Sequence, residues 1–355
     1  MMKRNTSRML IILCAILVSA AVVVLMVKPW RPEALALPPV NSLEDPGPVV
    51  AMPESPLPVI TAPTATPPAV EPAAEPVQPH SAQANVETNE LVARGLAASA
   101  GGRHIQARTL LSEAFFAGGL SPEQEAKIVP EMERLFNETI LSPRIFDGDE
   151  YVEQCIPMPG QTLAGSRGIV ESKCLYVPAN FIVMVNRMGS GQNMQAGKSI
   201  KLVKGPFVAR VYKSRLAMDL YLQPEGRPPL FARRLPVGLG KDGATPSGRW
   251  RLIAGGKTER KPWTPTAGSN LPPAPIPWGH PDYALGFKGM WIGLAGLDAD
   301  NQHITDFGIH STSDQDSIGG ETSLGCVRMK DADIELVFNM LYDGRGVFSV
   351  VEVVD

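Results

Sequence analysis

The sequence predicts a multidomain protein: an N-terminal transmembrane helix, a small all-α module, a small βααβ domain and a C-terminal mainly-β domain. Three observations lead to this expectation. An apolar stretch of membrane-spanning length lies near the N-terminus, a proline-rich segment follows it, and the pattern beyond it changes from a helical period to short strands. The 355 residues suffice for several domains, and a net charge of −3 argues against a nucleic-acid partner.

The membrane segment is expected at residues 9–27, where Ser19 is the only ordinary polar residue. This stretch is long enough to cross a bilayer as a helix. It is preceded by basic residues, namely Lys3, Arg4 and Arg8. The positive-inside rule therefore places residues 1–8 in the cytoplasm and the rest of the chain outside. We expect a single-pass cytoplasmic membrane protein whose C-terminal domain lies in the periplasm or cell-wall space. A cleaved signal peptide is the alternative, although its apolar core is normally about 7–15 residues long.

Residues 28–88 are expected to form a proline-rich, disordered linker. Between Pro32 and Pro79 there are 14 prolines among Ala, Val, Glu and Thr, with no helical or strand period. Such a segment cannot build a packed core and favours extended polyproline-II conformations. We interpret it as a spacer, with a polyproline ligand for another domain as the alternative.

Residues 89–149 are expected to form a helical module of two or three antiparallel helices. One apolar stripe at helical spacing runs from Ala107 to Phe115 and a second from Ile128 to Phe136. Between them, Ser121 to Gln124 has the pattern of a capping box with proline at the first helical position. The module is either a binding unit of unknown role or a packing collar for the next domain.

Residues 150–204 have the order strand, turn, helix, helix, strand. A Pro159-Gly160 turn is expected to feed a helix capped near Thr162, and Gly197 a turn into the last strand. This order resembles a LysM module, a family that binds glycans containing N-acetylglucosamine. The usual Gly-Asp-Thr-Leu stands here as Gly160-Gln161-Thr162-Leu163. The resemblance implies a glycan-binding domain, and a domain of the same shape that binds no sugar is the alternative.

Two cysteines, Cys155 and Cys174, lie in this βααβ domain. Outside the cytoplasm a disulfide between them is chemically permitted. Their spacing alone cannot establish one. Pairing these two would leave Cys326 free.

Residues 206–355 are rich in short strands bounded by Gly, Pro and charged residues. Strands are expected at 207–212, 217–222, 231–237, 249–253, 290–294, 307–309 and 347–354, and a helix at 331–342. The segment 261–281 is rich in Pro, Gly and Trp. A loop of that length in a compact domain is usually functional, so we expect it to cover the active site. His280, within it, is a weaker candidate for substrate contact.

The most informative stretch of this domain extends from His310 to Arg328 and combines an imidazole with a thiol. Polar and small residues separate His310 from Cys326, so the chain can double back and bring the two side chains together. A Cys/His pair is the minimum for thiol nucleophilic catalysis, because an imidazolium lowers the thiol pKa. The backbone N–H groups of Gly325 and Cys326 could face a developing oxyanion. Arg328 could place a cation beside an anionic substrate. The alternative is a buried structural cysteine.

This stretch resembles the signature of the L,D-transpeptidase catalytic domain of the YkuD type, written H-G-T, S-I-G and S-H-G-C-[IV]-R-[ML]. Here it stands as His310-Ser311-Thr312, Ser317-Ile318-Gly319 and Ser323-Leu324-Gly325-Cys326-Val327-Arg328-Met329. The Thr-Pro-Ser-Gly at 245–248 also belongs to the resemblance, which covers residues 206–355. Ser311 stands where glycine is common and Leu324 where histidine is usual. Leu324 puts a secondary polar contact near the oxyanion or substrate in doubt.

The resemblance implies a β-sandwich-like mixed sheet and a peptidoglycan substrate. Cys326 would be the nucleophile and His310 the general base, held by a backbone carbonyl near Ser311 or Thr312. Arg328 and Ser323 would bind the donor, with Ser311 and Thr312 beside them in the substrate site. The product would be a 3→3 cross-link, or an amine attached to the tetrapeptide stem.

A non-catalytic wall tether and an L,D-carboxypeptidase are the alternatives. We expect peptidoglycan as the partner, and the membrane through the N-terminal helix. We expect no cofactor, and no metal because no close ligand pair such as C-x-x-C or H-x-x-x-H occurs.

Overall fold

The computed structural model describes residues 82–165, 168–265, 269–344 and 346–355, with side chains from residue 85 onward. The expected membrane segment, 9–27, and the linker up to residue 81 lie outside the described residues. Within the described part of the chain, no helix combines the length and apolarity that a membrane crossing requires.

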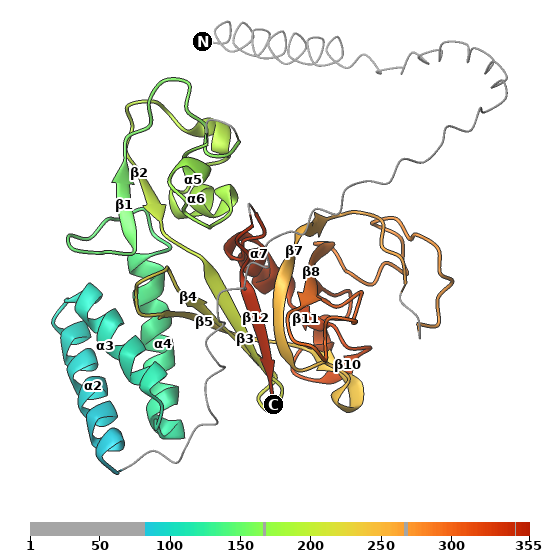
Figure 1. Cartoon of the computed structure of the whole chain (residues 1–355), viewed down its shortest axis with the longest axis horizontal. Coiled ribbons are helices and arrows are strands. Elements are labelled where there is room, and N and C mark those ends of the chain that lie inside the picture. Colours follow the sequence, from blue (N-terminus) through green and yellow to red (C-terminus); the bar gives the residue numbers. More distant parts are fainter. Residues whose placement is uncertain (1–81, 166–167, 266–268, 345) are drawn as a thin grey trace, which may run out of the picture. The chain divides into compact units, whose positions relative to one another are not determined.

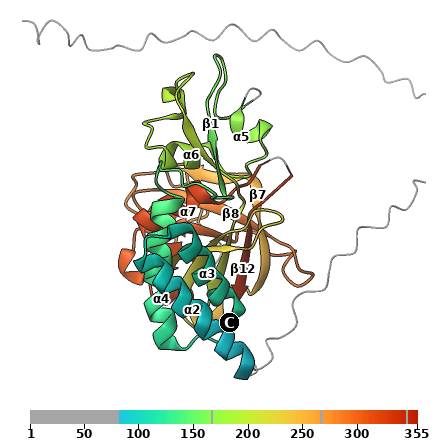
Figure 2. The same cartoon turned by 90° about the vertical axis from the view of Figure 1, so that its left-hand side faces the viewer.

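The helical module contains three helices: α2 (Ala82–Ala100), α3 (His104–Ala117) and α4 (Pro122–Thr139). Because α2 already begins at residue 82, the expected boundary between linker and module at 88/89 is wrong. The capping box is confirmed: Gln124 N–H donates to Ser121 Oγ (3.2 Å), and Ser121 N–H donates to Gln124 Oε1 (2.9 Å). α3 packs against both α2 and α4, and Figure 2 shows the three helices side by side.

The module packs against two strands, β4 (Ala217–Leu222) and β5 (Leu230–Pro236), as Figure 1 shows. Its buried face includes Leu111 and Met132 and joins Tyr221 and Phe231 of these strands in one apolar cluster. At the same contact Phe231 N–H donates to Ser112 Oγ (3.2 Å). Burial of this face stabilises the helices as part of the larger fold. The module thus packs on the C-terminal sheet, whereas the packing collar was expected for residues 150–204, so both interpretations of the module stay open.

The βααβ order of residues 150–204 is confirmed. β1 (Val152–Cys155) pairs antiparallel with β2 (Ile200–Val203); between them lie α5 (Ile169–Ser172), α6 (Ala179–Val185) and a 3-10 turn, η1 (Gly191–Asn193). The helix expected near Thr162 begins instead at Ile169. Thr162 belongs to a turn, because its hydroxyl donates to Ala164 C=O (2.8 Å) and its carbonyl accepts from Ile169 N–H (2.9 Å).

Cys155 and Cys174 are both free thiols in this structure. Cys155 lies half-buried in β1, whereas Cys174 is exposed after α5. The disulfide that the sequence permits is therefore not formed.

A buried polar network connects the helical module to the βααβ domain. Arg108 of α3 forms an ion pair with Asp149 (2.8 Å), and both side chains are fully buried. The Lys201 ammonium donates to the carbonyls of Thr139, Ser142 (3.0 Å) and Arg144 (2.8 Å). Burial lowers the pKa of Lys201 to about 8. These bonds satisfy charges that would otherwise be costly to bury.

The C-terminal domain contains one eight-stranded mixed sheet with the strand order β11-β9-β8-β7-β12-β3-β4-β5. The strands not yet bounded are β3 (Phe207–Tyr212), β7 (Gly248–Glu259), β8 (Met290–Gly296), β9 (Gly308–Ser311), β11 (Val327–Met329) and β12 (Val350–Val354). β12 pairs antiparallel with β7 and parallel with β3, so it joins the two halves into one continuous, near-barrel sheet (Figure 1). A mixed sheet was expected and is present. The expected β-sandwich-like arrangement is wrong, because β12 makes the sheet continuous.

The remaining elements lie around this sheet. They are the parallel pair β6 (Leu239–Gly240) and β10 (Glu321–Ser323), the helix α7 (Asp331–Met340), and the 3-10 turns η2 (Lys241–Gly243) and η3 (Gln315–Ser317). The expected strands 207–212 and 217–222 are confirmed to the residue. β7 extends beyond the expected 249–253, because a bulge between Leu252 and Lys257 lets its pairing with β8 resume.

Candidate active site

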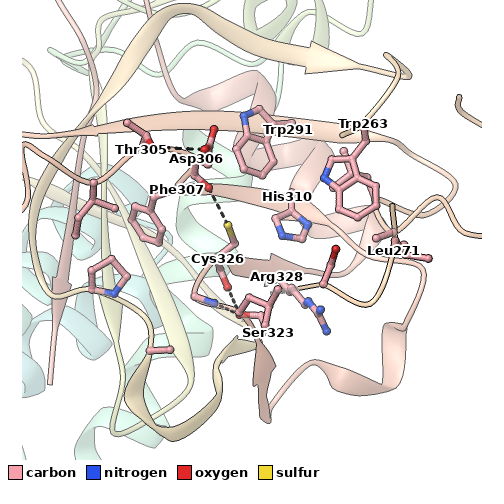
Figure 3. Close-up of a pocket in the computed structure, with 18 of the residues that line it drawn as sticks. Trp263, Leu271, Trp291, Thr305, Asp306, Phe307, His310, Ser323, Cys326 and Arg328 are labelled. Atoms are coloured by element: carbon pink, nitrogen blue, oxygen red, sulfur yellow. Dashed lines mark hydrogen bonds between the residues drawn. The ribbon is translucent and has the colours of Figure 1, made fainter. Parts of the chain in front are cut away.

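A cavity of about 530 Å³ opens at the ends of β9 and β11 and collects the residues of the sequence motif. Cys326, His310 and Arg328 all line it, together with Ser323 and Gly325, as Figure 3 shows for the labelled side chains. The structure therefore brings the expected thiol, imidazole and guanidinium into one site.

Strand register explains this arrangement. β9 and β11 are parallel neighbours in which Arg328 lies opposite His310. Side chains alternate between the two faces of a strand, so residues two apart share a face. Cys326, two residues before Arg328, therefore projects to the same face as His310.

His310 is held in a defined orientation and is only 8% exposed. Its Nδ1 donates to the carbonyl of Ser311 (2.6 Å), because a carbonyl can only accept. This confirms the expected backbone carbonyl and leaves Nε2 as the proton acceptor. Burial, reinforced by the positive charge of Arg328, lowers the pKa of His310 to about 4. The imidazole is therefore neutral at pH 7.

The Cys326 thiol is protonated in this state. Sγ donates to the carbonyl of Asp306 (3.5 Å). Burial raises the pKa of Cys326 to about 11, against the opposing effects of the Gly308 N–H and the Arg328 charge. Among the described residues no hydrogen bond joins Sγ to His310. Desolvation favours the neutral forms of His310, which is buried, and of Cys326, which is half-buried, so no imidazolium lowers the thiol pKa in this state.

The turn before Cys326 is organised by side chains that the motif alone does not assign. Gly325 adopts φ +142°, a backbone conformation that favours glycine. Thr245, from the Thr-Pro-Ser-Gly segment, donates from Oγ1 to Gly325 C=O (2.9 Å) and accepts from Gly240 N–H (2.7 Å). This buried threonine therefore ties the turn to β6.

Only one of the two expected oxyanion donors is available. Gly325 N–H donates to Ser323 Oγ (3.1 Å), which in turn donates to Cys326 C=O (2.7 Å). Ser323, expected to bind the donor, lines the cavity but is only 2% exposed, and its hydroxyl closes this turn. Within the described chain, Cys326 N–H has no hydrogen-bond acceptor, so of these two donors it is the one left free for an oxyanion.

Ser311 and Thr312, expected in the substrate site, are buried and do not line the cavity. Ser311 follows His310 in the strand, so its side chain projects to the opposite face. There its Oγ accepts from Met290 N–H (3.0 Å). Thr312 Oγ1 accepts from Asp314 N–H (3.1 Å). Neither side chain reaches the cavity in this structure, and their contact with substrate stays a prediction.

Arg328 and Leu324 define the polarity of the cavity beside Cys326. Arg328 Nη1 donates to Thr322 Oγ1 (3.2 Å), and its buried Nε has no partner. No carboxylate in the described chain forms an ion pair with this guanidinium, which leaves its charge for a ligand. Leu324 is 61% exposed at the cavity, so an apolar side chain occupies the position of the usual histidine.

The 261–281 loop contributes to the cavity as expected. Trp263 and Leu271 from this loop line it, and both are labelled in Figure 3. His280 does not line it; its Nδ1 accepts from Asp282 N–H (3.2 Å). In the described chain no group of three His, Cys, Asp or Glu side chains could hold a metal ion.

Several lining residues were not expected from the sequence, among them Trp291 and Asp306. The ring of Trp291 stacks on His310 with centroids 5.5 Å apart and an interplanar angle of 19°. Asp306 contributes its backbone carbonyl to the thiol. Only the pairing of strands distant in sequence reveals these neighbours, so no local signal could have found them.

Comparisons with known proteins match the region of the chain that contains the site. Residues 217–353 match the model of the YkuD family, the L,D-transpeptidase catalytic domain. The chain is 26% identical over 223 residues to "Probable L,D-transpeptidase YbiS" of Escherichia coli strain K12, covering 56% of this chain and 68% of that protein. It is 30% identical over 131 residues to "Probable L,D-transpeptidase ErfK/SrfK" of Salmonella typhimurium, covering 34% of this chain and 38% of that protein.

Among solved structures, the L,D-transpeptidase from Mycobacterium smegmatis is 16% identical and covers 45% of this chain and 64% of that chain. Its TM-score of 0.29 is below the level that indicates a common fold over the whole chain. On the sequence matches, the C-terminal region contains a YkuD-type L,D-transpeptidase catalytic domain, and the protein is an enzyme of this class.

Proposed function

We propose that this protein is a cysteine-dependent peptidoglycan L,D-transpeptidase that acts on tetrapeptide stems through a thioester. One observation carries the proposal: Cys326, His310 and an Arg328 guanidinium that has no carboxylate partner among the described residues share a cavity, and His310 presents Nε2 as a base. A nucleophile and a base within one cavity, with the base oriented by a third group, are the parts that covalent acyl transfer requires.

Acylation begins from the neutral pair. The thiol leaves the Asp306 carbonyl and transfers its proton to His310 Nε2 while Sγ bonds to the donor carbonyl carbon. The carbonyl oxygen takes up negative charge facing Cys326 N–H. When the C–N bond after the third stem residue breaks, the imidazolium protonates the leaving D-amino acid. The Arg328 charge offers a partner for a carboxylate of the donor.

Deacylation uses the same base. His310 Nε2 removes a proton from an acceptor amine as its nitrogen attacks the thioester carbonyl, and the C–S bond then breaks. Sγ regains the proton. An amine acceptor gives a 3→3 cross-link or an attached amine, and water gives carboxypeptidase activity.

The rest of the chain is consistent with a location at the cell wall. We propose that residues 9–27 anchor the protein in the cytoplasmic membrane and that residues 28–81 extend the folded part toward peptidoglycan. The βααβ domain would then hold glycan strands, an assignment that rests on its partial LysM resemblance. Pull-down of residues 150–204 with insoluble peptidoglycan tests this part separately.

The central test uses a protein that comprises residues 82–355. Its intact mass is measured after exposure to a carbapenem, and its turnover of a tetrapeptide stem is measured in parallel. Wild-type protein should gain one adduct and convert the stem. Cys326→Ala should do neither, whereas Cys174→Ala, which removes an exposed thiol outside the cavity, should behave as wild type.

His310→Ala should slow acylation by about 10²–10⁴-fold, the usual contribution of a general acid–base. A wild-type protein that neither gains the adduct nor changes the stem would overturn the proposal. The non-catalytic wall tether would then remain.

A further inference from the structure

We propose that Trp291 is a positioning residue that holds the His310 imidazole in place for proton transfer from Cys326. This inference rests on the proposed role of His310 as the base. It begins from strand pairing: β8 and β9 are antiparallel, and Trp291 lies opposite His310. The two rings stack with 5.5 Å between centroids and 19° between planes.

A pair of glycines makes room for the indole. Gly293 and Gly308 lie opposite each other in the same two strands, two residues from Trp291 and His310. They therefore share the face that carries the two rings. A Cβ at Gly308 would lie 2.8 Å from Trp291 Cζ2, and a Cβ at Gly293 would lie 3.2 Å from Trp291 Nε1. The indole thus rests over a stretch of sheet without side chains.

The two glycines and the indole that packs on them lie next to Cys326 as well as His310. Gly308 supplies the backbone N–H that lowers the pKa of the Cys326 thiol, so the indole covers the backbone between thiol and imidazole. Trp291 also lines a second cavity of about 230 Å³, and Trp263, Leu285 and Asp306 are likewise common to both. The indole therefore lies beside both cavities and covers one face of the His310 ring.

The stack has two consequences for the reaction. The stacked indole restricts rotation of the imidazole, which the hydrogen bond from Nδ1 to Ser311 C=O fixes at one edge only. Misplacement of a catalytic group by about 1 Å can lower the reaction rate about 10²-fold. The indole also keeps water from the ring, which favours the neutral base. Loss of the indole should therefore slow acylation and return the pKa of His310 toward its ordinary value.

The experiment measures the rate of carbapenem acylation of Trp291→Leu and Trp291→Phe between pH 3.5 and 9. We expect acylation of Trp291→Leu to be about 10- to 100-fold slower at pH 7. The pH below which its acylation rate falls should move up toward ~6.5. Trp291→Phe should recover most of the rate and most of the wild-type pH dependence. Phe287→Leu, which changes an exposed aromatic residue outside the cavity, is the control.

Acylation of Trp291→Leu whose rate falls below the same pH as that of wild type would overturn the inference, whatever its rate at pH 7. If that variant does not fold, Trp291→Met, which also removes the ring but keeps a long apolar side chain, is measured in its place, and the same readout decides. An unreactive wild-type protein would instead refute the proposed function, so the two failures are distinguishable.

Discussion

Alkylation of Cys326 by iodoacetamide reports the protonation state of the resting site. Thiolate is the reactive form, and burial raises the pKa of this thiol to about 11. At pH 7 such a thiol is ionised in roughly one molecule in 10⁴, whereas an ordinary thiol with a pKa of ~8.5 is ionised to about 3%. We therefore expect Cys326 to react about 300-fold more slowly than an ordinary thiol.

The dependence on pH has a definite sign. Because the folded pKa lies above the ordinary value, the alkylation rate should rise about tenfold per pH unit from pH 7 to beyond pH 9. His310→Ala should not slow alkylation at pH 7, since a neutral imidazole contributes no positive charge to a thiolate. The same substitution should slow carbapenem acylation strongly, because that reaction needs the base.

The measurement is peptide mass spectrometry of protein labelled for timed intervals at each pH. Exposed Cys174 provides an internal reference in the same sample. After denaturation without reductant, Cys155, Cys174 and Cys326 should all be labelled. A rate for Cys326 that is already constant between pH 6 and 8 would show a preformed thiolate–imidazolium pair and refute the neutral resting state.

Three further predictions concern stability. Arg108→Met leaves the Asp149 carboxylate buried without its partner and should lower the free energy of unfolding by about 3–5 kcal/mol in urea titrations. Thr245→Val leaves Gly240 N–H and Gly325 C=O unsatisfied, and the same titrations should show a loss of about 1–3 kcal/mol. The folded pKa of His310, about 4, lies below the ordinary ~6.5, so the unfolded chain binds a proton first as the pH falls. Between pH 6.5 and 4 the free energy of unfolding of the wild type should therefore fall by about 3 kcal/mol more than that of His310→Gln. An equal fall in the two proteins would contradict a buried, neutral His310.

Much of the fold follows from local patterns. The strands Phe207–Tyr212 and Ala217–Leu222 were predicted from short apolar runs between charged and turn residues, and the capping box of α4 from four residues. The turn at Thr162 was not predicted, because a threonine shortly after Pro-Gly is equally compatible with a helix cap and with a hydrogen-bonded turn. Local sequence does not distinguish the two when the helix depends on tertiary packing.

The sequence by itself determined which residues carry the chemistry of this protein: a thiol, an imidazole and a guanidinium in one recognisable motif. Only the tertiary structure decided what surrounds them. Strand pairing turned Ser311 away from the cavity and brought Trp291 onto His310, because register is set between strands distant in the chain. Burial left thiol and imidazole neutral, since desolvation of a charge depends on every element packed around it and on no single segment of sequence.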